Sequence, residues 1–308
     1  MSDSAESYRD LGRRLSNWGR WGDDDESGTL NLLTEECRVA AAALVESGEM
    51  FDLGIPLDEH GPQTGGTGRQ NPLHIMTRTP LDPPASSGFH YFDDALFAHL
   101  QSATQLDGLA HVAYDGELYN GVPVEAVSWS GAARLGMQHY ASRIQGRGVL
   151  LDLPRLGGRA RLDAAEPVTA ADLDRAVQAE GVEIRSGDIL FVRTGWITVF
   201  SEDRDREAFF ATEPGLALDA AEWLRERDIA FVAADNWGVE VAPAPDGSEM
   251  PLHCVLIRDL GMPLGEMLDL EAAAAHADST GRWEFQATCL ALPVTGGIGS
   301  ILLPTVTF

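Results

Sequence analysis

The sequence GDILFVRTGW at residues 187–196 decides the fold class. Its apolar run begins after the turn residues Ser-Gly-Asp and ends at Gly195, which is typical of a buried strand between two turns. Two similar runs lie on either side of it in the sequence, GVLLDL at residues 148–153 and IAFVAA at residues 229–234. The three runs predict three buried strands.

The segments between these strands have helical patterns. A Thr cap opens residues 169–181, where Leu173 and Val177 are four residues apart, and residues 216–227 form a second amphipathic pattern. Strands that alternate with helices indicate an α/β domain.

Both ends of the chain add further elements. A Thr followed by two glutamates predicts a helix over about residues 35–47, residues 50–57 have the pattern of a strand, and GSILLPTVTF at residues 299–308 predicts a last strand. Because several strands have no helix between them, we expect a mixed sheet rather than a purely parallel one. No boundary divides the chain, so we expect one domain over residues 1–308, with residues 1–50 as an N-terminal extension packed on it.

The charge balance excludes several classes of partner. The 308 residues carry 22 Lys and Arg against 48 Asp and Glu, a formal net charge of −26, and 44% of them are hydrophobic. The apolar side chains suffice for a packed core, whereas nucleic acid and anionic membrane surfaces would repel the chain.

The sequence also lacks targeting and redox signals. It has no uncharged apolar stretch of about 18 residues, and its first ten residues are polar and acidic, so we expect neither a membrane-spanning helix nor a secretory signal. Three widely spaced cysteines offer no disulfide framework. A cytoplasmic location is the simplest expectation.

Residues 58–90 are rich in Gly, Pro, Thr and His and show little periodicity. We expect an irregular segment here, and one of this length inside a compact domain is more often functional than idle. It contains His74 and Arg78, which are candidate substrate contacts, since an arginine can pair with a substrate carboxylate.

The sequence LQSATQLDGLAHV at residues 100–112 is the main candidate for a chemical site. Asp107 and His111 are four residues apart and would share one face of a helix, as would Gln101 and Gln105. Carboxylate and imidazole groups both bind divalent metals. The residues alone leave open a surface Asp–His pair with no such role. No dinucleotide-binding, P-loop, zinc-protease or serine-hydrolase motif is present elsewhere.

This segment resembles the signature of the cyclase family of metal-dependent hydrolases, which includes bacterial kynurenine formamidase and isatin hydrolase. The signature is His-x-Gly-Thr-His-x-Asp and, after three intervening residues, another His. With Asp107 and His111 aligned on it, Thr104 takes the place of the family's threonine. Gln101 and Gln105 stand where the family has its two leading histidines, so half of the polar pattern matches and half departs.

Other stretches resemble the same family in the same order along the chain. They are NWGRWG at residues 17–22, GTLN at 28–31, GRGVLLD at 146–152, GDIL at 187–190, RTGW at 193–196, PLH at 251–253, GEMLDL at 265–270 and GS at 299–300. The resemblance implies the swivelling β/β/α fold with a mixed sheet, assembled as a homodimer or homotetramer.

The resemblance also implies a divalent metal. The family supplies a late His and Glu to its metal site, and His253 and Glu266 match them. The expected ligands are therefore Asp107, His253 and Glu266, with Gln101 completing the site. A carboxamide oxygen is a harder and weaker ligand than imidazole, which favours Mn²⁺ over Zn²⁺. The sequence leaves open whether the site binds Mn²⁺ or Zn²⁺, or no metal at all.

The expected function is hydrolysis of an amide, a lactone or a related cyclic carbonyl compound by a metal-activated water. We expect His111 to be the general base, because imidazole titrates near neutral pH, and Gln105 to help bind the oxyanion. Two alternatives stay open. One is cyclase, lyase or isomerase chemistry on a natural-product intermediate, and the other is a non-catalytic relative that binds a small carbonyl compound.

Four further residues are candidate contacts for this small-molecule substrate. Asp235 and Trp237 come directly after the apolar run at 229–234, and polar residues at the carboxyl end of a strand often face a site. Tyr119 and Asn120 follow His111 closely enough to reach the same cavity.

Overall fold

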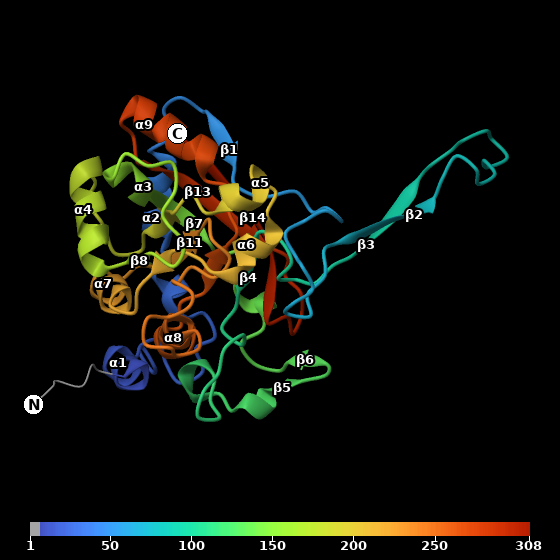
Figure 1. Ribbon diagram of the computed structural model, residues 1–308. Helices are drawn as coiled ribbons and strands as arrows, with labels where there is room; N and C mark the ends of the chain where they lie inside the picture. Colours follow the sequence, from blue (N-terminus) through green and yellow to red (C-terminus); the bar gives the residue numbers. More distant parts are fainter. Residues whose placement is uncertain (1–6) are drawn as a thin grey trace, which may run out of the picture.

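A closed sheet forms the centre of the computed structural model, which describes residues 7–308 (Figure 1). Eight strands follow the order β1-β14-β13-β7-β9-β11-β12-β4, and β4 also pairs with β14, which closes the sheet into a ring. These strands are β1 Met50–Asp52, β4 Gln105–Asp107, β7 Gln145–Asp152, β9 Ile189–Arg193, β11 Phe231–Ala234, β12 Leu264–Glu266, β13 Glu284–Ala291 and β14 Gly299–Thr307. The strand β1 lies outside the ring, on β14.

The ring has a parallel half and an antiparallel half. The strands β7, β9, β11 and β12 pair in parallel. The strands β4, β14 and β13 pair antiparallel with each other and with the ends of the parallel half. The mixed sheet expected from the sequence is therefore confirmed.

Three helical segments cover the outer face of the parallel half. They are α4 (Ala170–Glu180), α7 (Ala220–Glu226), and α8 (Pro251–His253) continued by the π-helix η5 (Cys254–Leu260). Leu151, Val192 and Val232 face this helical layer. Leu106 and Phe285 come from other strands of the ring but belong to a single second cluster, so they face inward. The result is a strand layer, a second strand layer and a helical layer, the β/β/α order expected from the resemblance.

Shorter elements surround this centre. They are the helices α1 Tyr8–Leu15, η1 Gly28–Leu32, α2 Glu35–Ala42, η2 Tyr119–Gly121, η3 Val124–Ala126, η4 Met137–His139, α3 Leu153–Leu156, α5 Ile197–Ser201, α6 Arg206–Ala211 and α9 Glu271–Thr280, and the strands β2 Leu73–Arg78, β3 Asp93–Phe97, β5 Val127–Ser128, β6 Gly131–Ala132, β8 Pro167–Val168 and β10 Gly215–Leu216. Within residues 7–308 no helix has the length and apolar character needed to cross a membrane.

The helix α4 shows why the sequence predicted it well. Thr169 accepts a hydrogen bond from the backbone N–H of Asp172 at 3.3 Å, and Asp172 accepts one from the backbone N–H of Thr169 at 2.9 Å. This capping box satisfies N–H groups that the first turn leaves free. Gly181 caps the end of the helix, and its φ of 68° suits a residue without a side chain.

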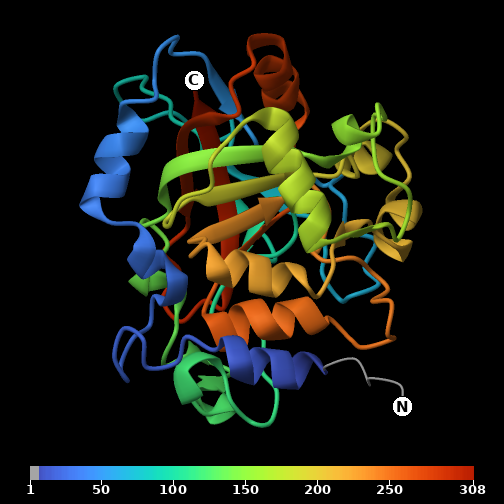
Figure 2. The ribbon, with the colours of Figure 1, turned by 90° about the vertical axis from the view of Figure 1, so that its left-hand side faces the viewer.

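The N-terminal segment lies against η5. Figure 2 shows α7, η5 and α1 stacked one beneath the other. The side chain of Asn17 donates to the backbone carbonyl of Leu260 at 2.9 Å, and the indole of Trp18 donates to that of Arg258 at 2.7 Å.

The structure differs from the sequence analysis at four places. The helical arrangement considered for residues 100–112 does not form, and this segment contains the short strand β4, which has three residues and is too short to show a strand period. The segment at residues 58–90, expected to be irregular, contains the strand β2, which pairs with β3 in a hairpin that projects from the molecule (Figure 1). All but one of the residues in this hairpin's two strands are exposed. Because neither strand has a buried face, the sequence shows no alternation of apolar and polar residues that would predict it. The helix predicted to about residue 47 also ends earlier, at Ala42, and the strand predicted over 50–57 ends at Asp52.

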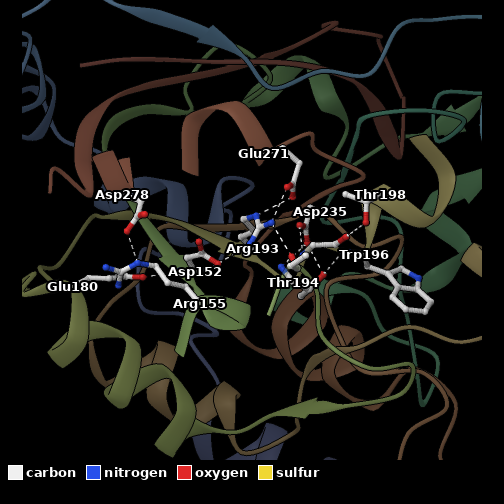
Figure 3. Close-up of polar contacts among 12 residues, drawn as sticks. Asp152, Arg155, Glu180, Arg193, Thr194, Trp196, Thr198, Asp235, Glu271 and Asp278 are labelled. Carbon is white, nitrogen blue, oxygen red and sulfur yellow. Dashed lines mark hydrogen bonds and ion pairs between the residues drawn. The ribbon is translucent and has the colours of Figure 1, made fainter. Parts of the chain in front are cut away.

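A polar network joins the carboxyl ends of the parallel strands (Figure 3). Arg193, at the end of β9, donates to Asp152 at 2.8 Å and to both carboxylate oxygens of Glu271, at 2.8 and 2.7 Å. Glu180, at the end of α4, accepts from the backbone N–H of Asp152 at 2.8 Å through Oε1, whereas its buried Oε2 has no partner within residues 7–308. Burial therefore raises the pKa of Glu180 to about 8.

This pKa predicts how stability depends on pH. Because the ordinary value is 4.5, the folded chain keeps a proton on Glu180 that the unfolded chain releases between about pH 4.5 and 8, so stability falls as pH rises through this window. Glu180→Gln keeps the acceptor but cannot ionise. We expect the variant to gain about 1–3 kcal/mol over the wild type between pH 5 and 8. Urea unfolding at several pH values measures this gain.

The matched control is Glu226→Gln, at a carboxyl whose side chain is 66% exposed. It should leave the pH profile of the wild type unchanged. Parallel stability curves for Glu180→Gln and the wild type would show that Glu180 does not titrate with folding.

Candidate functional site

The closing strand β4 determines which polar side chains meet. In its antiparallel pair with β12, Gln105 lies opposite Glu266 and Asp107 lies opposite Leu264. Opposite residues in such a pair share one face of the sheet, as do residues two apart in a strand. Gln105, Asp107 and Glu266 therefore project from the face opposite to the inward-facing Leu106.

His253 reaches this cluster from the helical layer. Pro251 opens α8, and Met250 before it has a φ of 46°, which turns the chain sharply into the helix. The Nε2 atom of His253 is 3.1 Å from Oε1 of Glu266, and its Nδ1 atom is 2.6 Å from Oε1 of Glu240. One ring nitrogen is thus fixed by Glu240, and the other faces the cluster.

Three side chains of the cluster form a possible metal site. Asp107, His253 and Glu266 each offer one ligand atom, and these atoms all lie within 4.8 Å of one another. The three residues are 2%, 4% and 2% exposed. Two carboxylates and one imidazole form a ligand set that suits Mn²⁺ or Zn²⁺.

The carboxamide of Gln105 supports this interpretation. Its Nε2 atom donates to Oε2 of Glu266 at 2.5 Å, whereas its buried Oε1 atom has no partner among the residues that the structure describes. A buried carbonyl oxygen without a donor is costly, and a cation between Gln105 and the carboxylates would satisfy it. The residues present therefore fit a divalent metal.

His111 lies beside the cluster rather than in it. Its Nε2 atom is 3.1 Å from Oδ2 of Asp107, and its side chain is 20% exposed. Its Nδ1 atom has no hydrogen-bond partner within residues 7–308. Asp107 thus fixes the orientation of the imidazole and leaves one nitrogen free.

A cavity of about 630 Å³ adjoins these groups. Asp107, His111, His253 and Glu266 line one side of it. The remaining wall comes from Gln63, Thr64, Gly66, Thr67, Arg69, Val112, Glu207, Phe210, Ala211, Trp237, Gly238, Glu249 and Met250. The volume suits a small organic molecule.

Burial and neighbouring charges both shift the pKa values of the titratable groups of the cluster. Burial would raise the pKa of Asp107, but the charge and hydrogen bond of His111 hold it below its ordinary value. Burial and the charge of Asp107 raise the pKa of Glu266. Burial would lower the pKa of His253, but its contacts with Glu240 and Glu266 raise it well above its ordinary value. The converging carboxylates thus favour a positive charge at this position, and a cation could supply it.

The sequence analysis missed Glu240, which positions His253. This carboxylate accepts hydrogen bonds from the backbone N–H of Leu252 at 3.1 Å and of His253 at 2.8 Å, besides facing Nδ1 of His253. Such a carboxylate fixes the tautomer and orientation of a ligand histidine. The available signal was a charged residue between Val239 and Val241, which indicates a buried carboxylate with a partner.

The sequence analysis also missed Glu213. Its Oε2 atom accepts from the backbone N–H of Trp237 at 2.6 Å and of Gly238 at 3.1 Å, while its buried Oε1 atom has no partner in the described part of the chain. Burial and the charge of Glu266 raise its pKa well above the ordinary value. A Cβ atom on Gly238 would lie 2.7 Å from this Oε1, so only glycine fits here without a shift. No sequence pattern pointed to Glu213.

Comparisons with known proteins identify the family. The family model described as "Putative cyclase" matches residues 51–241. A crystal structure of "a novel cyclase" is 38% identical to the chain, with a TM-score of 0.89, and the match covers 96% of this chain and 100% of that one. The chain belongs to the cyclase family.

More distant structures share the fold of this cyclase-family chain. Isatin hydrolase A from Ralstonia solanacearum is 17% identical, with a TM-score of 0.60 over 89% of this chain and 97% of that one. A "predicted metal-dependent hydrolase" from Bacillus stearothermophilus is also 17% identical, with a TM-score of 0.54 over 85% of this chain and 98% of that one. The curated proteins gave no match.

Two of the remaining candidates lie at or near the site. Trp237 lines the cavity, and its ring centroid is 6.1 Å from that of Phe210. Its buried Nε1 atom has no partner among the described residues. Gln101 packs over Gly299, which lies opposite Asp107 in the pair of β4 and β14. The Nε2 atom of Gln101 is buried and unpaired within residues 7–308, and Gln101 does not line the cavity.

The other predicted contacts lie away from the cavity. Asp235 is fully buried and accepts from the backbone N–H groups of Thr194 and Gly195, at 2.8 and 2.7 Å, so it fixes the turn after β9 (Figure 3). Tyr119 donates to Asp25, and Asn120 donates to the backbone of the N-terminal segment. His74 and Arg78 lie on the β2–β3 hairpin, where His74 pairs with Asp94 at 2.7 Å.

Removing Glu240 should destabilise the fold. Glu240→Ala leaves two backbone donors and the His253 imidazole without their buried acceptor, and we expect a loss of about 3–5 kcal/mol in the free energy of unfolding. Glu240→Gln keeps one acceptor oxygen and should lose less. Urea unfolding at pH 7 measures both, with Glu226→Ala as an exposed control expected to change by less than about 0.5 kcal/mol. A loss below about 1 kcal/mol for Glu240→Ala would contradict its positioning role.

Proposed function

We propose that this cyclase-family chain is a metal-dependent hydrolase that acts on an amide, a lactone or a related cyclic carbonyl compound. The observation that carries the proposal is the buried set of Asp107, His253 and Glu266 at the wall of a cavity of about 630 Å³. The names of the structural neighbours, isatin hydrolases and metal-dependent hydrolases, support the same class of reaction.

Asp107, His253 and Glu266 would hold Mn²⁺ or Zn²⁺, and Gln105 would turn its free Oε1 toward it. When bound, the metal would polarise the substrate carbonyl and lower the pKa of a bound water. Glu240 keeps the proton of His253 on Nδ1, so that Nε2 stays free to act as a ligand.

His111 is the proposed general base. Asp107 binds its Nε2 atom and orients the ring, and the buried Nδ1 atom, which has no partner within residues 7–308, is where the ring would accept a proton from the attacking water. Once protonated, the imidazolium lies 3.1 Å from a carboxylate oxygen that stabilises its charge.

The cavity wall supports a ring-shaped or planar substrate. The side chains of Phe210 and Trp237 offer aromatic surface, and the buried Nε1 atom of Trp237 has a hydrogen to donate to a substrate oxygen. Arg69 is the only Lys or Arg among the lining residues that the structure describes, and it could bind an anionic substituent.

The first test of the proposal is metal binding. Calorimetric titration of Mn²⁺ and Zn²⁺ into chelator-stripped protein should show one site. Asp107→Asn and Glu266→Gln should each weaken binding at least about tenfold, because each removes a charged ligand. Gln105→His should raise the affinity for Zn²⁺, because imidazole binds borderline metals better than a carboxamide does.

The matched control is Asp163→Asn, at a carboxyl whose side chain is 88% exposed, and it should bind both metals like the wild type. If Asp107→Asn binds as tightly as the wild type while both are folded by circular dichroism, the assigned site is wrong.

The second test is catalysis. We expect the Mn²⁺ or Zn²⁺ form to open members of a panel of lactones, cyclic amides and formanilides in ¹⁸O-labelled water, with label in the product acid. His111→Gln should lower kcat by about 10²–10⁴ and change metal affinity less than about threefold. His139→Gln, at a half-exposed histidine that faces Glu26, is the control and should keep full activity.

Turnover without label would favour the cyclase, lyase or isomerase alternative. Binding without turnover under every divalent ion would favour a non-catalytic relative, and either result would contradict the hydrolase.

A further inference from the structure

The cavity beside the proposed metal site is bounded on one side by a loop, residues 63–71, which we call the arginine loop. Two hydrogen bonds tie its ends together. The backbone N–H of Gln63 donates to Oδ1 of Asn71 at 2.8 Å, and Nδ2 of Asn71 donates to the backbone carbonyl of Gln63 at 3.1 Å. The side chain of Gln63 also donates to the backbone carbonyl of Ser102, in the segment that leads into β4, at 3.1 Å. The loop is therefore compact and anchored beside the site, as functional loops often are.

Arg69 lies on this loop, lines the cavity and is partly buried. Within residues 7–308 its guanidinium has no ion pair and no hydrogen bond. Most arginines of the chain do pair with a carboxylate, as Arg147, Arg193 and Arg258 do in the interior. With 48 Asp and Glu against 22 Lys and Arg, an arginine without a carboxylate partner is unexpected. Its donors are available to a ligand.

The charges of the cavity wall make this free guanidinium the one place for an anion. Four carboxylates line the cavity, those of Asp107, Glu207, Glu249 and Glu266. Arg69 is the one Lys or Arg among the lining residues that the structure describes, and none of the four carboxylates is close enough to pair with it. Elsewhere along this wall an anionic group would meet repulsion.

Arg69 lies near enough to the proposed metal site for one small molecule to contact both. Burial would raise the pKa of Asp107, but the charges of His111, His253 and Arg69 lower it. The guanidinium therefore acts on Asp107 across the cavity without contacting it. A gap of this kind between a cation and a reactive cluster suits a substrate with two functional ends.

The chemistry of the loop favours a carboxylate over a phosphate as the anionic group. The guanidinium presents a planar fork of N–H donors that matches the two oxygens of a carboxylate. A phosphate would bring more negative charge toward a wall that holds four carboxylates and a single arginine. One arginine balances the single charge of a carboxylate.

We propose that Arg69 binds a carboxylate of the substrate, remote from the bond that reacts, and so selects anionic members of the amides, lactones and cyclic carbonyl compounds considered above. For the reacting bond this inference rests on the proposed function. Because the rest of the wall is acidic, Arg69 also sets the orientation of the substrate. The carboxylate lies at the arginine loop, and the carbonyl group lies toward Asp107, His253 and Glu266.

Binding of matched ligands tests the carboxylate site without turnover. The anionic probes are isophthalamate and terephthalamate, which carry a carboxamide and a carboxylate on one benzene ring, and the neutral probes are the corresponding dicarboxamides. In calorimetric titrations of the full chain without added metal, at least one anion should bind about 10- to 100-fold more tightly than its neutral partner, because hydrogen bonds to a charged group are the strong ones. Added NaCl should reduce this preference.

Arg69→Gln should remove most of the preference, and Arg69→Lys, which keeps the charge without the planar fork, should retain part of it. The matched control is Arg38→Gln on α2, at a partly buried arginine that has no partner within residues 7–308 and does not line the cavity. It should keep the preference of the wild type. With folding checked by circular dichroism, a wild type without the preference overturns the proposal, and so does an Arg69→Gln variant that retains it.

Turnover by the metal-loaded chain separates this proposal from the proposed function. The substrates are meta- and para-formamidobenzoate and their neutral carboxamides. Arg69→Gln should raise KM for the carboxylates at least about tenfold more than for the carboxamides, and the loss should fall on KM rather than on kcat, because Arg69 binds a group remote from the reaction. An equal effect on both kinds of substrate would overturn the carboxylate site and leave the hydrolase standing. An anion preference in binding without turnover of any substrate would do the reverse.

Discussion

The structure depends on pairing the three residues of β4 on both of their edges. The strand β12 binds one edge and β14 binds the other, which closes the ring and turns Leu106 inward. The same pairing fixes Gln105 and Asp107 on the opposite face, beside Glu266. A slip of one residue would exchange the two faces, and would place two polar groups in the core and Leu106 in the site. Fold closure and site assembly are therefore one constraint.

All but one of the buried acidic side chains discussed near β4 are stabilised by a histidine. Asp107 faces His111, and Glu266 and Glu240 face the two nitrogens of His253. Glu213 is the exception, because burial and the charge of Glu266 raise its pKa and favour its neutral form. Buried acidic side chains cost desolvation free energy and contribute nothing to packing. Their concentration beside one cavity therefore indicates a chemical role.

The sequence predicted the elements that have their own local signals. The cap of α4 and the apolar runs of β7, β9 and β11 appear where expected, and the family resemblance brought together Asp107, His253 and Glu266. The sequence pattern could not predict β4, because three residues are too few to show an alternation of apolar and polar positions. It could not predict the β2–β3 hairpin either, because this hairpin is apolar on both faces. Asp235 does follow a strand, but three hydrogen bonds to Thr194 and Gly195 occupy its carboxylate. That fact depends on tertiary contacts, as does the role of Glu213.

The closing strand also has a consequence for biosynthesis. Gln105 is synthesised 161 residues before Glu266, its partner in the site. The strand β14, which pairs with the other edge of β4, comes after all the other strands of the ring. Domains form during synthesis from the N-terminal side, at about 5–20 residues per second. The segment around β4 must therefore wait for many seconds for its β12 partner, and a nascent chain shorter than 266 residues lacks the complete ligand set. A metal ion held by Asp107, His253 and Glu266 would therefore bind late in synthesis, and would stabilise a fold already formed rather than direct its formation.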